Sequence, residues 1–90
     1  MASTRNTSVE VVVYHAQGCH LCDRALEQLH ALRGELGFSL REVDITGDAA
    51  LEAAYREWLP VVEIDGRRRF TYHVRPEAFR RAVAQAGAQS

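Results

Sequence analysis

The 90-residue sequence lacks several features that would point to particular classes of protein. No apolar run approaches the roughly 20 residues that span a membrane, so no membrane association is expected. The first eight residues, MASTRNTS, lack the apolar core of a secretory signal. The formal net charge is −1, so no overall basic field calls for nucleic acid as a partner. We therefore expect a cytoplasmic protein and, by default, a monomer.

Cysteine is also scarce, since the chain contains Cys19 and Cys22 and no other. In a reducing cytosol, a disulfide between them would be transient or catalytic rather than structural. The sequence has no second C-x-x-C or C-x-x-H motif that could complete a zinc site. A closed four-ligand zinc site within one chain would therefore be irregular, and no metal is expected. Two alternatives stay open at this point: a metal or iron–sulfur cluster bound through the pair, and two buried, inert thiols.

Composition indicates one small globular domain. Hydrophobic residues make up 47% and charged residues 26% of the chain, as in soluble proteins. We expect residues 1–8 to be a disordered arm and residues 9–87 to be the folded domain.

Hydrophobic periodicity predicts an alternation of strands and helices. The expected strands cover 9–15, 38–45, 61–64 and 68–74, and the expected helices begin at Cys19, after the capping residues 46–48, and at Pro76. Gly34 and Gly37 mark the end of the first helix, and Asp65-Gly66 is a strong hairpin signal. The order is therefore β-α-β-α-β-β-α. Because helices join the first three strands, parallel pairing is favoured among them, with helices on both faces of the sheet.

The two cysteines fall at the predicted start of the first helix. Residues three apart share one helix face, so the two thiols can approach each other. The free N–H groups and partial positive charge of a helix N-terminus favour a thiolate, the form that attacks disulfides. Cys22 continues the apolar stripe and is expected to be shielded. We therefore predict that Cys19 attacks a disulfide and that Cys22 releases the mixed disulfide.

Three stretches, VVVYHAQGCHLCDRAL, LREVDI and YREWLPVVEIDG, resemble small glutaredoxin-like proteins over residues 9–83. The resemblance implies an α/β thioredoxin fold with a four-stranded mixed sheet flanked by helices. It also implies a cis peptide bond before Pro60, with Leu59 offering backbone hydrogen bonds to an extended substrate. His20 and Trp58 are further candidates for substrate contact. The helical spacing of Trp58 with Leu51 nevertheless favours a place in the core.

The function implied by this resemblance is thiol–disulfide oxidoreductase activity. The substrate would be a protein disulfide or the mixed disulfide of a low-molecular-weight thiol, and the partner a thiol substrate or reductant protein. No bound cofactor is expected; glutathione or another small thiol would serve as electron donor. The chain departs from glutathione-using relatives, because it has Trp58-Leu59-Pro60 in place of Thr-Val-Pro and lacks a Gly-Gly after the fourth strand. A redox-inert adaptor that keeps the fold is the remaining alternative.

Overall fold

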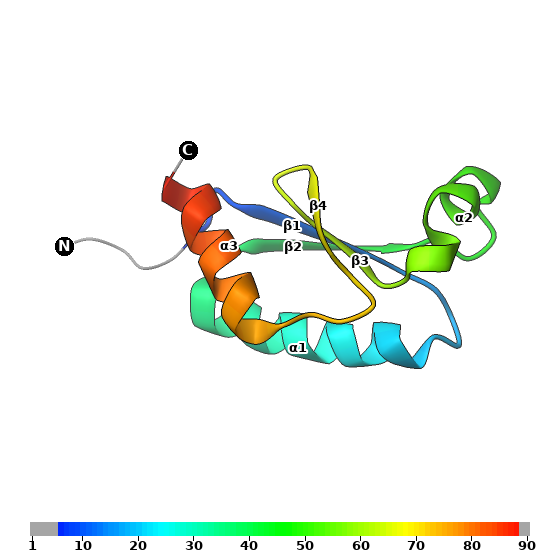
Figure 1. Ribbon diagram of the computed structural model, residues 1–90, viewed down its shortest axis with the longest axis horizontal. Coiled ribbons are helices and arrows are strands. Elements are labelled where there is room, and N and C mark those ends of the chain that lie inside the picture. The colour runs from blue at the N-terminus through cyan, green and yellow to red at the C-terminus, as the bar shows by residue number, and fades with distance from the viewer. Residues whose placement is uncertain (1–5, 89–90) are drawn as a thin grey trace.

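The computed structural model describes residues 6–88 and shows the predicted order of elements (Figure 1). In chain order these are β1 (Glu10–His15), α1 (His20–Leu36), β2 (Ser39–Asp44), α2 (Ala49–Tyr55), a short 3₁₀ helix η1 (Arg56–Trp58), β3 (Val61–Ile64), β4 (Arg67–Thr71) and α3 (Pro76–Ala88). None of the helices in this part of the chain is long and apolar enough to cross a membrane.

The four strands form one mixed sheet in the order β2-β1-β3-β4. Strand β1 is parallel to β2, as predicted, but antiparallel to β3, so the prediction of three parallel strands is wrong. The connection explains the difference. Helix α2 has seven residues and spans about 10 Å, whereas the six-residue β2 spans about 20 Å. The helix alone is therefore too short to carry the chain back along the sheet, and the chain enters β3 from the end at which β2 leaves.

One face of the sheet carries the hydrophobic core. Helices α1 and α3 pack together on this face, as Figure 1 shows. The core residues alternate along the strands and repeat every three or four residues along the helices, as side chains that share one face must. They are Val9, Val11, Val13, Ala25, Leu29, Leu32, Phe38, Val62, Ile64, Val74, Phe79, Ala82 and Val83.

The second face of the sheet is covered only in part, because α2 contributes no buried residue. Figure 1 places α2 beyond the end of the sheet. Tyr55, its last residue, stacks on Tyr14 of β1 with ring centroids 3.9 Å apart. The Tyr55 hydroxyl donates a hydrogen bond to Glu63 at 3.3 Å. This stack attaches α2 to the face that α1 and α3 leave uncovered.

Local signals in the sequence place most of the turns correctly. Asp65 and Gly66 both have positive φ, at 49° and 83°, as a tight hairpin between twisted strands requires. Gly37 ends α1 in the left-handed conformation, with φ 79°. Pro76 opens α3, as predicted.

Part of the predicted N-terminal arm, residues 6–8, falls within the described residues. Residues 1–5 of that arm lie outside the described residues. Asn6, also assigned to the arm, is held against the domain, because its backbone N–H and its side-chain amide both donate to the Leu36 carbonyl, at 3.0 and 3.1 Å. Thr7 and Ser8 form the turn between Asn6 and Val9.

Candidate redox site

Cys19 is the N-cap of α1, and its sulfur takes part in the cap. The residue is extended, with φ −100° and ψ 105°, and its Sγ accepts a hydrogen bond from the Cys22 backbone N–H at 3.2 Å. A side chain that accepts from this position satisfies one of the orphan donors of the first helical turn. The predicted aim of a backbone amide at this sulfur is therefore present in the structure.

The two sulfurs are paired as a disulfide, with the Cα atoms 5.1 Å apart. That separation lies within the range of roughly 4.4–6.8 Å that disulfides use. Cys22 is fully buried, whereas Cys19 is half-buried. A partner arriving from solvent therefore meets Cys19 first, and Cys22 is shielded as expected.

The loop before Cys19 is held to the loop after β2. The Gln17 N–H donates to the Thr46 hydroxyl at 3.0 Å, and the Thr46 N–H donates to the Asp44 carboxylate at 2.9 Å. That backbone hydrogen bond is the main reason that the pKa of Asp44 lies below its ordinary value. Gly18 has φ 76°, a conformation that other residues adopt only with strain, and it lets the chain turn sharply into α1.

Pro60 lies at the same end of the sheet as the disulfide. Val61 pairs with Tyr14 near the end of β1, and three residues separate His15, the last residue of β1, from Cys19. The Leu59–Pro60 peptide bond is cis, and Pro60 is fully buried. Leu59 is extended, with φ −64° and ψ 143°. These angles lie in the polyproline II part of the extended region.

Trp58 is 45% exposed, so its predicted place in the core is wrong. The prediction assumed that one continuous helix carries Leu51 and Trp58 on the same face. Helix α2 instead ends at Tyr55, and the tighter η1 turns the following residues to a different side. Trp58 faces solvent two residues before Pro60, where it can contact a substrate.

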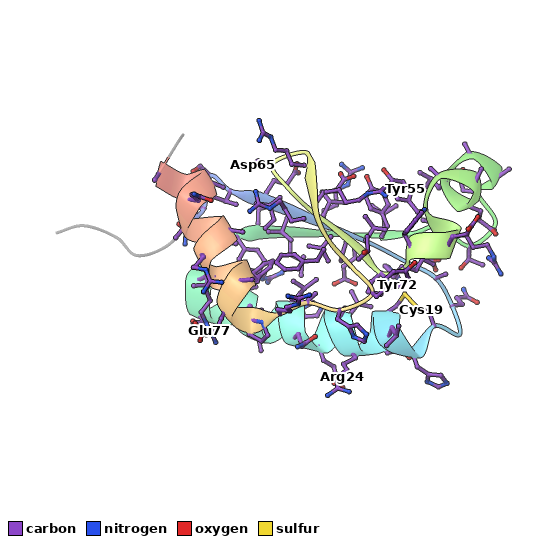
Figure 2. The ribbon with its side chains drawn as sticks, in the orientation of Figure 1. Cys19, Arg24, Tyr55, Asp65, Tyr72 and Glu77 are labelled. Carbon is purple, nitrogen blue, oxygen red and sulfur yellow. A yellow bond between two sulfur atoms is a disulfide. The ribbon has the colours of Figure 1, made fainter. Side chains whose placement is uncertain are left out.

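Tyr72 also lies beside the candidate site, in a position that the sequence did not predict. Strand β4 ends at Thr71, not at residue 74, because Tyr72 adopts φ 69° and turns the chain away. Its N–H donates to the Pro60 carbonyl at 3.0 Å, and its hydroxyl donates to the Glu57 carbonyl at 2.9 Å. Its ring lies 6.2 Å from that of Trp58, and Figure 2 shows it at the Cys19 end of the molecule. The strand-like sequence FTYHV gave no signal of this turn.

The histidines contribute less to the site. His20 is exposed on the first turn of α1, beside the disulfide. His15 is half-buried, and its carbonyl accepts from the Ile45 N–H at 2.8 Å. His30 lies farther along α1 and pairs with Glu42 at 2.7 Å.

The described part of the chain offers neither a buried carboxylate nor a metal site beside the cysteines. No charged side chain is buried among residues 6–88, so none stands ready there to accept a proton from Cys22. Within the same residues, no group of three His, Cys, Asp or Glu side chains could hold a metal ion.

Comparison with known proteins gives the same picture as the geometry. Residues 10–84 match the family described as "Glutaredoxin-like domain (DUF836)". The chain is 36% identical over 74 residues to the uncharacterized protein Rv0508 of Mycobacterium tuberculosis, covering 77% of this chain and 76% of that protein.

Solved structures have the same fold. The crystal structure of protein XcR50 from X. campestris is 32% identical, with a TM-score of 0.70, covering 83% of this chain and 96% of that one. Thioredoxin from Fasciola hepatica is 21% identical, with a TM-score of 0.63, covering 92% of this chain and 84% of that one. The chain therefore has the thioredoxin fold.

Proposed function

Because the chain belongs to the Glutaredoxin-like domain (DUF836) family, we propose that it is a thiol–disulfide oxidoreductase whose reactive pair is Cys19 and Cys22. The observation that supports this most directly is the Cys22 N–H aimed at the sulfur of the half-buried Cys19, while Cys22 itself is fully buried. A thiolate at Cys19 would be stabilised by that N–H and by the N-terminal end of the 17-residue α1.

The reaction begins from the reduced dithiol. The Cys19 thiolate attacks one sulfur of a substrate disulfide, so that a mixed disulfide forms and the other substrate sulfur leaves as a thiolate. Cys22 then loses its proton and attacks the Cys19 sulfur, which releases the second substrate thiol and leaves the Cys19–Cys22 disulfide. Two electrons pass from the pair to the substrate. Two equivalents of an external thiol, or one reductant protein, reduce the pair again.

The neighbouring residues would bind the substrate. Leu59 offers an extended backbone segment, Pro60 shapes the wall beside it, and Trp58 presents an exposed ring. His20 stands exposed beside the disulfide and would add positive charge when protonated. Since no carboxylate is buried in the described part of the chain, residues 6–88, we propose that water accepts the proton of Cys22.

Further parts of the proposal concern the surroundings of the protein. We place it in the cytoplasm as a monomer without a bound cofactor, with glutathione or another small thiol as electron donor. The proposed partner is a protein that supplies a thiol or a disulfide. We propose no binding to nucleic acid or to membranes.

The proposal is tested by equilibrating the protein with glutathione redox buffers and counting free thiols by alkylation and mass. The expected result is a single two-electron transition that disappears in Cys19→Ser. The variant Cys22→Ser should accumulate a mixed disulfide on Cys19, which mass spectrometry identifies, because the resolving sulfur is gone. An absence of reversible oxidation, together with no trapped mixed disulfide, would favour the redox-inert adaptor.

A further inference from the structure

The large apolar side chains that the described residues expose gather at one end of the molecule. They are Leu21, Trp58 and Tyr72, which are 37%, 45% and 40% exposed. Leu21 stands between the two cysteines, Trp58 precedes Pro60 by two residues, and Tyr72 is bonded to the Pro60 carbonyl. Exposed apolar side chains scattered singly need no explanation, but a cluster marks an interaction surface, and Trp and Tyr dominate such surfaces energetically.

Tyr72 holds this surface in place. Its two hydrogen bonds, to the carbonyls of Glu57 and Pro60, bracket the segment that carries Trp58. Its φ of 69° is uncommon for a residue with a bulky side chain, and such strain persists only where the surroundings impose it. The backbone that carries the indole is thus fixed before a partner arrives, which reduces the ordering cost of binding.

We propose that Trp58 and Tyr72 form a docking surface for a cysteine-bearing segment of a partner polypeptide with a large apolar side chain next to its cysteine. This inference rests on the proposed function, because a mixed disulfide with Cys19 would bring the partner's cysteine to this end of the molecule. The residues beside that cysteine would then cover the exposed rings. A small thiol without such a side chain would leave them in water.

The first test uses peptide disulfides and the Cys22→Ser variant. Two synthetic peptides carry a cysteine capped with 5-thio-2-nitrobenzoate, and they differ only in Leu or Ser beside that cysteine. The Cys19 thiolate attacks the peptide sulfur, a protein–peptide disulfide forms, and the coloured thiolate leaves, so its absorbance reports the rate. We expect the Leu peptide to react about tenfold faster, since interface aromatics commonly carry that much binding energy.

Matched variants assign the preference to the surface. Adding Trp58→Ala should bring the ratio of the two rates close to one, and Trp58→Phe should keep most of it. Tyr72→Phe, which keeps the ring and loses the hydrogen bond to Glu57, should lower the ratio partway. Equal rates for the two peptides in the parent protein would overturn the docking surface, whereas no release with either peptide would overturn the proposed function.

A second test does not depend on redox chemistry. Trp58 is the only tryptophan of the chain, so its fluorescence reports on this surface alone. With the peptide cysteine replaced by Ser, the Leu-bearing peptide should change the emission saturably and bind more tightly than the Ser-bearing one. Equal affinities, or no saturable change up to millimolar peptide, would overturn the proposal. So would a dimer in sedimentation analysis that dissociates in Trp58→Ala, because a second copy would then be the occupant.

Discussion

At the scale of single residues, the contacts around Cys19 and Tyr72 are made with backbone groups rather than with charged side chains. The Cys19 sulfur accepts from a main-chain N–H, and Tyr72 bonds two main-chain carbonyls. Almost any residue can provide such a backbone group, so the amino-acid sequence does not reveal which ones are used. The position of Cys19 at the start of a helix was predictable from the sequence, but the hydrogen bonds of Tyr72 were not.

Tyr55 gives a prediction that ordinary spectroscopy can check. Its hydrogen bond with Tyr14, its partial burial and the charge of Glu63 raise its pKa to about 12. In the unfolded chain the Tyr55 hydroxyl loses its proton near pH 10, whereas in the folded chain it keeps this proton to higher pH. The neutral hydroxyl therefore contributes stability below pH 10, and that contribution is lost as the pH rises toward 12.

Absorbance at the tyrosinate band should show a late-titrating tyrosine in the native protein that is absent from Tyr55→Phe. The same variant should have a flatter loss of stability in alkali. If the late transition persists in Tyr55→Phe, the assignment to Tyr55 is wrong.

At the scale of elements, α2 is the least anchored of the three α-helices. It buries none of its residues, and its N-terminus is capped by Asp48, whose carboxylate accepts from the Leu51 N–H at 3.0 Å. Elements with few buried contacts open at low free energy. Asp48→Ala should lower the stability of α2 by about 1 kcal/mol, so that its amides exchange about fivefold faster.

Hydrogen exchange measured residue by residue checks this expectation. Amides of α1 should be little affected, and Glu27→Ala, on the exposed surface of α1, serves as the control. A uniform increase across both helices would show that α2 opens only with the whole domain.

The elements also show what the sequence could predict. Helix starts and tight turns were predicted correctly where one residue decides them, as at Asp48, Gly37 and Pro76. The direction of β3 and the exposure of Trp58 were predicted wrongly. Both depend on the position of the short helix α2, which is determined by tertiary contacts such as the Tyr14–Tyr55 stack.

At the scale of the whole molecule, one core on one face of the sheet supports the site. Phe79 of α3 is fully buried, with its ring 5.3 Å from Phe38 and 6.0 Å from Phe70. Removing such a ring costs about 3–5 kcal/mol. A domain of this size has about 5–13 kcal/mol of stability at roughly 0.05–0.15 kcal/mol per residue. Phe79→Ala should therefore remove a large part of the total.

Urea unfolding measures that loss, with Arg81→Ala, exposed on the same helix, as the control. A loss below about 1 kcal/mol in Phe79→Ala would mean that the core tolerates the cavity or does not depend on this ring.

The most direct test of the central claim is the pH dependence of the alkylation rate of Cys19. The reduced Cys22→Ser variant isolates this thiol and keeps the backbone N–H of residue 22. If that N–H and the start of α1 stabilise the thiolate, the midpoint will lie below the value of about 8.5 for a free cysteine. A midpoint at or above that value would contradict the account.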